Sequence, residues 1–365
     1  MKVLIAPNAF KGTVEADEAS VIIGLALKEV RPDFESILSP IADGGDGTCF
    51  LLGKAMGLPQ TFQMALDALG RPILGFYYLD VKHQTAYLDV STVSGIKNLK
   101  PYELNPWTTG TYGTGELIRS AIDGGAKHIV LGLGGSATMD MGLGILRALG
   151  FIFLDKKGRE ISMFSEGIMG KIAHIQNPIP KPDIKFTCLC DVNNYFWGSQ
   201  GAIPVFGPQK GLKETEIIPY ENACKHFSSH LEKKSKKTIL DQEGFGAAGG
   251  IAFGLSAFFP MDLKMGANWF FEKTGMEGKI KNADLIITGE GRYDSQSAGG
   301  KGSYELLQMA KKFGKHTVLI TSGNGGDGSG FDQVIHLPEL NFNEPTFVAE
   351  AKNYLYDSVL NAFKL

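Results

Sequence analysis

The residues best suited to chemistry lie between positions 284 and 302. A short apolar run at 285–287 predicts a buried strand, and a loop follows it. That loop carries two carboxylates, an arginine and a lysine: Glu290, Arg292, Asp294 and Lys301. Carboxylates bind hard cations while arginine and lysine bind phosphate, so the set favours phosphoryl transfer. Taken alone, the stretch fits plain turns and a surface ion pair equally well.

A second acidic loop follows the strand predicted at 36–41. Asp43 and Asp46 flank two glycines, so both carboxylates can face one cation. The ligand spacing of an EF-hand calcium loop is absent, and Mg²⁺ with retained water fits better. This loop therefore predicts a magnesium site.

Other loops offer groups that bind anions or protons. Lys11 follows the first strand and can pair with a phosphate or a carboxylate. Two glycine- and threonine-rich loops, 108–115 and 132–138, are each expected to precede a helix and to cradle phosphate at its positive end. Asp191 ends a predicted strand, where a general base or a metal ligand would lie. Lys210 stands in a glycine- and proline-bounded turn.

Residues 132–137 also fit the glycine fingerprint of dinucleotide-binding proteins. The alternative function is therefore a nicotinamide-dependent oxidoreductase acting on a small hydroxy acid. A non-catalytic binding protein is less consistent with so many charged loops. The chain contains no Walker A motif.

Strands and helices are expected to alternate at both ends of the chain, which indicates a parallel sheet. Strands are predicted at 3–7, 36–41, 285–288, 318–321 and 333–337, with helices at 13–31 (Thr13 as N-cap), 48–56, 303–313 and 345–363. The middle differs, with paired strands at 72–78 and 84–90, helices at 115–123 and 213–237 (a charged, exposed helix), and strands at 128–131, 151–154 and 186–190.

The fold class predicted is α/β with two α/β domains. A discontinuous parallel-sheet domain, flavodoxin- or Rossmann-like, spans 1–60 plus 283–365, and a mixed α/β domain is inserted at 61–282. The active site is expected in the cleft, where closure excludes water.

Charge and composition indicate which kinds of partner and which cellular location to expect. The net charge of −3 over 365 residues favours neither nucleic acid nor an anionic membrane. The N-terminus lacks the features of a signal peptide and no apolar run is long enough to span a bilayer, so a cytoplasmic location is predicted. The four cysteines, at 49, 188, 190 and 224, are expected to be reduced and packed as apolar residues. No stripe or patch predicts an oligomeric state.

Eight collinear loops give the chain a family resemblance. They are APNAFKG at 6–12, PIADGGDGT at 40–48, TTGTYGTGELI at 108–118, LGLGGSATMDMGLGILRALG at 131–150, CDVNN at 190–194, FGPQKG at 206–211, GFGAAGG at 244–250 and ADLIITGEGRYDSQSAGGKG at 283–302. In these the chain resembles the glycerate kinase family of the bacterial glyoxylate-utilisation type.

The resemblance implies ATP-dependent phosphorylation of D-glycerate with Mg²⁺, giving 2-phosphoglycerate, with 3-phosphoglycerate as the alternative product. The chain departs from the family pattern at five positions. Asn8 stands where aspartate is usual, Asp46 replaces glutamate, Asn194 replaces proline, Tyr293 replaces an aliphatic residue and Ser297 replaces threonine.

A mechanistic hypothesis follows from the resemblance and from what phosphoryl transfer needs. Asp43, Asp46 or Glu290 would hold Mg²⁺. The ATP phosphates would lie on Gly134, Gly135, Ser136, Ala137, Thr138 and Lys301. Lys11 and Arg292, beside Asn8, would bind the substrate carboxylate or the transferring phosphoryl group, and Lys11 is also counted as catalytic. Asp191 or Asp294 would accept or orient the hydroxyl proton.

Overall fold

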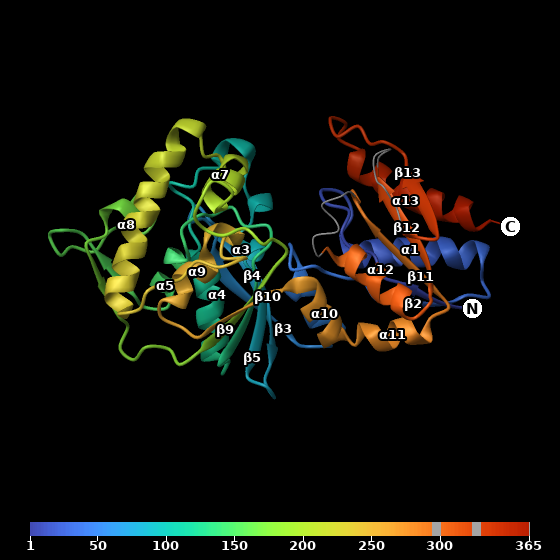
Figure 1. Ribbon diagram of the computed structural model, residues 1–365, viewed down its shortest axis with the longest axis horizontal. Coiled ribbons are helices and arrows are strands. Elements are labelled where there is room, and N and C mark those ends of the chain that lie inside the picture. The colour runs from blue at the N-terminus through green and yellow to red at the C-terminus, as the bar shows by residue number, and fades with distance from the viewer. Residues whose placement is uncertain (294–300, 323–329, 365) are drawn as a thin grey trace. The chain divides into compact units, whose positions relative to one another are not determined.

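A computed structural model describes residues 1–293, 301–322 and 330–364 (Figure 1). Asp294, one of the predicted catalytic residues, lies outside these ranges. The chain divides into two compact units. We call Met1–Asp43 with Gly266–Leu365 the discontinuous unit, and Gly44–Met265 the inserted unit.

These boundaries differ from the predicted ones at 60/61 and 282/283. Residues 44–60 belong to the inserted unit because α2 (Thr48–Ala55) packs on its sheet, where Asp89 accepts hydrogen bonds from the first turn of the helix. Residues 266–282 belong to the discontinuous unit because their two helices pack on its sheet and on its helix α12 (Gly302–Lys312). Sequence patterns locate helices but do not show which sheet a helix covers.

The discontinuous unit contains a five-stranded sheet in which all neighbouring strands are parallel. Its strands are β1 (Lys2–Ile5), β2 (Glu35–Leu38), β11 (Leu285–Glu290), β12 (His316–Ser322) and β13 (Gln333–Leu337). The spatial order β13-β12-β11-β1-β2 is the flavodoxin order, so the predicted fold class is confirmed. Three central strands, β1, β11 and β12, are buried apolar runs, as expected for a sheet covered on both faces.

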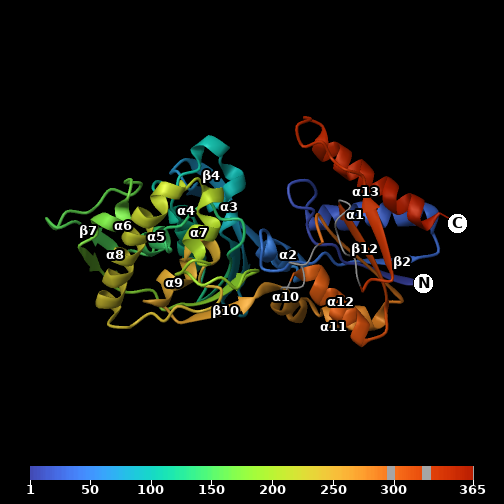
Figure 2. The ribbon, with the colours of Figure 1, turned by 45° about the horizontal axis from the view of Figure 1, so that its top comes forward.

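Helices cover both faces of this sheet (Figure 2). α1 (Ala16–Val30) and α13 (Phe347–Phe363) pack against each other, and α10 (Gly266–Thr274), α11 (Met276–Asn282) and α12 form the other group. The predicted N-cap of α1 was wrong. The helix begins at Ala16 after Glu15, because the Thr13 hydroxyl donates instead to the Phe10 carbonyl in a tight turn at 2.8 Å.

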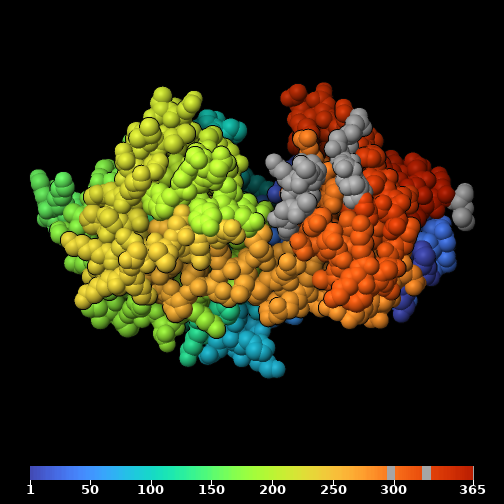
Figure 3. Space-filling view, in the orientation of Figure 1, coloured from blue at the N-terminus to red at the C-terminus, as the bar shows by residue number. Residues whose placement is uncertain are grey.

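The inserted unit contains a six-stranded mixed sheet in the order β10-β9-β6-β5-β4-β3. Its strands are β3 (Gln60–Leu66), β4 (Pro72–Asp80), β5 (Thr85–Asp89), β6 (His128–Gly132), β9 (Lys185–Cys190) and β10 (Met261–Met265). β5, β6, β9 and β10 run parallel, and the predicted antiparallel pair β4–β5 is confirmed. The turn joining β4 to β5 projects at the lower edge of the space-filling view (Figure 3). The edge strand β3 was not predicted.

The remaining elements surround a core rich in phenylalanine. They are the strand pair β7 (Ile152–Leu154) and β8 (His174–Gln176), and the helices α3 (Ser91–Ser94), α4 (Tyr112–Asp123), α5 (Leu143–Ala148), α6 (Ile168–Lys171), α7 (Ala202–Phe206), α8 (Ile217–Ser235) and α9 (Ile251–Ser256). Helix α8 was expected to be exposed, but it buries one face that includes Tyr220, Phe227 and Leu231. Those side chains recur at helical spacing among the lysines and are easily overlooked.

The four cysteines are buried and form no disulfide, as predicted. Burial raises the pKa of each thiol. In the part of the chain that the structure describes, no helix is long and apolar enough to cross a bilayer.

Candidate functional site

In the discontinuous unit, the loops that follow β1 and β11 lie side by side. The backbone amide of Asn8 donates to the carbonyl of Gly289 at 2.8 Å. A Cβ on Gly291 would lie 3.3 Å from the backbone nitrogen of Lys11. β1 is the strand where the sheet order reverses, so these loops stand at its topological switch point. Ligands of open α/β sheets bind at this place.

Asn8 and Asp43 form a buried pair at this edge. The Asn8 Nδ2 donates to Asp43 Oδ2 at 2.8 Å, while Asn8 Oδ1 accepts from the Ala9 amide at 2.8 Å. Gly302 packs on the pair, since a Cβ there would lie 3.5 Å from Asn8 Nδ2. An ionised aspartate at position 8 could not donate to Asp43, so the asparagine holds this carboxyl group through a hydrogen bond from an uncharged donor.

Glu290 ends β11 and is only 5 % exposed. Its Oε2 lies 3.8 Å from Lys301 Nζ, and its Oε1 is buried with no hydrogen-bond partner in the described residues. Burial raises the pKa of Glu290 to about 7, against the opposing effects of Lys301, of a hydrogen bond with Ser303 and of Lys11, while the Asp43 charge adds to the rise. A carboxylate in this setting needs a proton or a bound cation.

The three predicted metal ligands do not form one preformed cluster. Within residues 1–293, 301–322 and 330–364, no three His, Cys, Asp or Glu side chains form a group that could hold a metal ion. Asp43 and Glu290 belong to the discontinuous unit, whereas Asp46 belongs to the inserted unit and pairs with Lys97 at 2.8 Å. Magnesium needs few protein ligands, because it keeps water and binds substrate phosphates.

The predicted substrate ligands Lys11 and Arg292 are both exposed on the discontinuous unit. Lys11 follows β1 and Arg292 follows β11, next to the backbone contact between their loops. The structure therefore places both cations at the switch point, near Glu290.

In the inserted unit, two glycine-rich loops and the end of β9 meet backbone to backbone. A Cβ on Gly134 would lie 2.1 Å from the Gly45 carbonyl carbon, and one on Gly44 would lie 2.3 Å from the Cys190 carbonyl oxygen. Only glycine permits such approaches. They bring the loops after β6 and β9 together, with Asp191 half-buried directly after β9.

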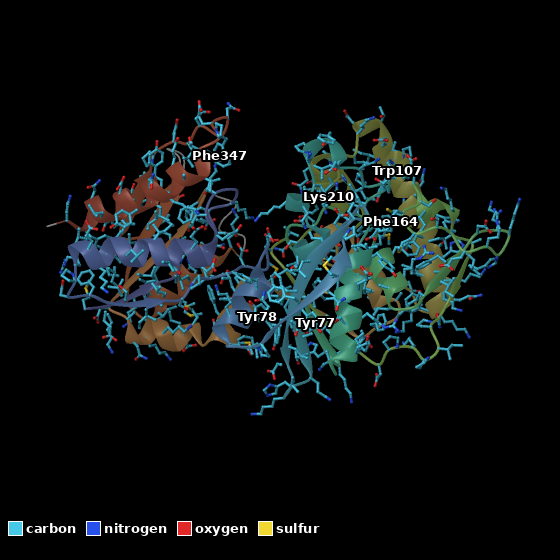
Figure 4. The ribbon with its side chains drawn as sticks, turned by 180° about the vertical axis from the view of Figure 1, so that it is seen from behind. Tyr77, Tyr78, Trp107, Phe164, Lys210 and Phe347 are labelled. Carbon is cyan, nitrogen blue, oxygen red and sulfur yellow. The ribbon has the colours of Figure 1, made fainter. Side chains whose placement is uncertain are left out.

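Lys210 contacts the loop after β6. Its ammonium is buried, with the residue 4 % exposed, and donates to Ser136 Oγ and to the Thr138 carbonyl, each at 2.8 Å. Burial lowers the pKa of Lys210 to about 7, although the charge of Asp140 opposes the shift. The Thr138 hydroxyl is buried with no hydrogen-bond partner in the described part of the chain. Figure 4 labels Lys210.

Sequence reasoning gave Lys210 no role. The available signal was the run Gly207-Pro208-Gln209-Lys210-Gly211. Gly211 has a φ of +94°, and a Cβ at this position would lie only 2.0 Å from the Leu104 carbonyl oxygen, so the turn requires glycine. Such a turn restricts the position of the lysine backbone. The sequence does not show that the lysine side chain contacts the loop at 134–138.

The loop at 132–138 was expected to lead directly into a helix, and this was wrong. The next helix, α5, begins only at Leu143 and has six residues, and the cation that contacts this loop is the ammonium of Lys210. The dinucleotide fingerprint also requires a helix directly after the glycines, which is absent here. At the start of α4, the amide and hydroxyl of Thr111 both donate to Asp140 Oδ2 at 2.9 Å.

Asp140 and Asp89 are buried carboxylates that the sequence did not single out. Asp140 also accepts from the amides of Gly142 and Gly144, and so ties the loop after β6 to α4 and α5. Asp89 accepts from the amides of Cys49 and Phe50 at the start of α2, yet burial raises its pKa to about 7. Both carboxylates hold loops in place.

These observations define an α/β protein with two units whose charged, glycine-rich loops lie at the carboxyl ends of parallel strands. Comparison with known proteins identifies the family. The model of the glycerate kinase family matches residues 3–365. The chain belongs to this family and is an enzyme that phosphorylates an alcohol group.

Named relatives cover most of the chain. It is 35 % identical over 337 residues to a glycerate kinase of Bacillus subtilis (strain 168), covering 90 % of this chain and 87 % of the relative. It is 34 % identical over 323 residues to the glycerate 2-kinase of Escherichia coli (strain K12), covering 88 % and 84 %. A crystal structure of a protein assigned as glycerate kinase 2 from Salmonella typhimurium LT2 matches with a TM-score of 0.82 and 32 % identity, covering 100 % of this chain and 97 % of that one.

Proposed function

We propose that the protein transfers the γ-phosphoryl group of ATP to the 2-hydroxyl of D-glycerate. The bond from the 2-oxygen to the γ-phosphorus forms while the bond from that phosphorus to the β,γ-bridging oxygen breaks. The products are 2-phosphoglycerate and ADP, and the hydroxyl proton passes to a carboxylate. The E. coli relative named glycerate 2-kinase supports the choice of the 2-hydroxyl.

One observation carries the phosphoryl-transfer chemistry, namely the buried ammonium of Lys210 on the Gly134–Thr138 loop. Burying a lysine ammonium that donates no hydrogen bond to a carboxylate costs folding free energy, unless an anion binds beside it. The loop adds backbone amides and two hydroxyls, of Ser136 and Thr138. Together they would bind the ATP phosphates.

Lys301 stands at the N-cap position of α12, an eleven-residue helix. In the proposal it supplies a second phosphate contact from the discontinuous unit, where its ammonium lies near Glu290. The helix N-terminus adds to the positive potential at this point.

Asp43 and Glu290 fit a magnesium ion best. Both are buried carboxylates near each other. The Oε1 of Glu290 has no hydrogen-bond partner among the described residues, so it is available to bind a cation. Asp46, paired with Lys97, is a ligand only if that pair opens. Bound Mg²⁺ would neutralise the charge of the ATP phosphates.

The exposed cations Lys11 and Arg292 would bind the glycerate carboxylate or the transferring group, with Asn8 beside them. Arginine suits a planar carboxylate because its guanidinium can donate two parallel hydrogen bonds. Asp191 or Asp294 would take the hydroxyl proton.

The direct test is to incubate the protein with ATP, Mg²⁺ and D-glycerate and to follow phosphorus by NMR. A phosphate monoester coupled to the C2 proton establishes 2-phosphoglycerate, whereas coupling to the two C3 protons identifies 3-phosphoglycerate. ADP formation with another hydroxy acid alone would retain the chemistry and change the substrate. Absence of turnover together with NADH binding would contradict the proposal.

Replacing Asp191 with asparagine tests the proton acceptor. We expect kcat to fall by about 10²–10⁴-fold, because that is the usual contribution of a positioned base, while the affinity for ATP stays nearly unchanged. Asp294→Asn is the matched variant, since only one of the two carboxylates is needed as the base. An unchanged kcat in Asp191→Asn would remove Asp191 from the mechanism.

A further inference from the structure

The inserted unit contains a partly open pocket that is lined in part by the loop at 108–115 and by Asp140. Aromatic and apolar side chains make up much of its wall, including Trp107, Tyr112, Met163, Phe164 and Tyr220. Figure 4 labels Trp107 and Phe164. A partly open pocket with flat aromatic walls and few polar groups suits a planar aromatic ligand.

Arg147 is a charged residue of the pocket wall whose side chain lacks a full set of hydrogen-bond partners among the residues described. Arg147 is 9 % exposed at its side chain, and its Nη2 donates to Glu160 Oε1 at 2.5 Å and to the Ile161 carbonyl at 2.6 Å. Its Nη1 is buried and has no hydrogen-bond partner among the residues described. A buried donor without a partner is rare in native proteins and indicates that a ligand acceptor completes it.

The wall of the pocket adjoins the loop that Lys210 contacts. Thr109, in the pocket wall, donates from its hydroxyl to the Ala137 carbonyl at 3.2 Å, and Asp140 lines the pocket only two residues after Thr138. Two residues span at most about 7 Å. A nucleotide with phosphates at Lys210 therefore has its nucleoside end within reach of the pocket.

We propose that this pocket binds the purine base of the nucleotide. The proposal rests on the proposed function, in which the phosphates of ATP lie on the loop at 134–138. The base would stack on the aromatic wall of Trp107 and Phe164, and one of its ring nitrogens would accept the unpaired hydrogen bond of Arg147. This assigns nucleotide selection to the inserted unit.

The experiment measures the binding of adenosine, which carries no phosphate, by calorimetry. We expect Phe164→Ala and Ser165→Trp, the first opening the pocket and the second filling it, each to weaken adenosine and ADP binding at least tenfold. The binding of inorganic tripolyphosphate should stay unchanged, because its site is the Lys210 loop. Tyr102→Ala is the control, since Tyr102 is an aromatic residue of the same unit that is 79 % exposed.

Adenosine affinity that is equal in all four proteins would overturn the pocket, and ATP turnover in the same samples shows whether the kinase function survives that result. Loss of adenosine binding in both variants, but no phosphoryl transfer to glycerate by the unaltered protein, would retain the pocket and contradict the proposed function. Two variants are used because each changes the packing differently, so a folding defect in one leaves the other decisive.

Discussion

Glu290 in the discontinuous unit and Lys210 in the inserted unit carry side chains of opposite charge, and burial disfavours the charged form of both. Each lies in or against a loop at the end of a parallel strand. Burial raises the pKa of Glu290 to about 7 and lowers the pKa of Lys210 to about 7. Each is thus balanced between its charged and neutral forms near neutral pH.

The contrast is consistent with the proposed function, in which Mg²⁺ binds at Glu290 and the ATP phosphates bind at Lys210. A bound cation stabilises the ionised form of Glu290, and a bound anion stabilises the ionised form of Lys210. ATP with Mg²⁺ presents both charges in one substrate. In the proposed function, the bound cation would offset the cost of burying Glu290, and the bound phosphates would offset the cost of burying Lys210.

The strongest way to break the comparison is Lys210→Met. We expect kcat/KM for ATP to fall about 10²–10³-fold, the usual loss when a preorganised donor to a reacting phosphoryl or oxyanion is removed. Steady-state kinetics measures this, with circular dichroism to verify folding. Lys185→Met is the control and should keep full activity. Lys185 is exposed and begins β9, at the end of the strand away from Asp191. Equal loss in both variants would separate Lys210 from the site.

Glu290→Gln tests the acidic side. We expect the affinity for Mg²⁺ in the presence of ADP to fall at least about 10–100-fold, the loss seen when a residue that only supports a metal ligand is removed, and kcat to fall with it. The variant should also be more stable than the unaltered protein at pH 8 without metal, by about 3 kcal/mol.

The sign follows from the pKa of Glu290, about 7 in the folded protein against 4.5 as its ordinary value. The folded state binds a proton more tightly, so the unfolding free energy falls as pH rises from about 4.5 to 7. Urea denaturation at pH 5 and pH 8 measures this slope, which Glu290→Gln should reduce. An identical slope in the two proteins would show that Glu290 does not titrate in this window.

Asn8→Asp sharpens the acidic side by restoring the residue usual in the family. Without metal, the hydrogen bond to Asp43 is lost and two carboxylates face each other, so we expect a loss of about 1–3 kcal/mol in unfolding free energy. Added Mg²⁺ should recover this loss and bind more tightly than in the unaltered protein. Thermal unfolding with and without Mg²⁺ measures both effects. Asn8→Ala, which removes the bond without adding charge, should show no recovery.

The smallest expected effect is proton uptake on phosphate binding. At pH 8.5 Lys210, with its pKa of about 7, is mostly neutral in the protein without ligand. A bound polyphosphate raises this pKa, so tripolyphosphate binding should take up close to one proton. Calorimetry in two buffers of different ionisation enthalpy measures the uptake, which Lys210→Met should abolish. Uptake that persists in the variant would assign it to another group.

Much of the fold could be predicted because strand and helix periodicities are local. The five strands of the discontinuous unit and the pair β4–β5 were predicted from their apolar runs, whose spacing depends only on neighbouring residues. The edge strand β3 was missed, since its alternating pattern is weak, and Phe62 and Met64 are more than half exposed. The unit boundaries were displaced because helices α2, α10 and α11 can pack on either sheet as far as the sequence shows.

The candidate site was predictable in its loops but not in its contacts. Glu290, Asp43 and Asp191 could be selected because they follow strands, where carboxyl ends collect ligands. Lys210, Asp140 and Arg147 could not, because the side chain of a lysine, an aspartate or an arginine is usually solvated. Their importance comes from burial, which the sequence does not display.

By itself, the sequence determined most of the strands and helices, the glycine-rich loops and the family to which they belong, because these depend on short-range patterns of residue type. Only the tertiary structure decided which side chains lose water. It buries Lys210 against Ser136 and Glu290 beside Lys301, over sequence separations of 74 and 11 residues. Desolvation depends on every atom packed around a group, and so the charges that bear on function are set by the fold as a whole.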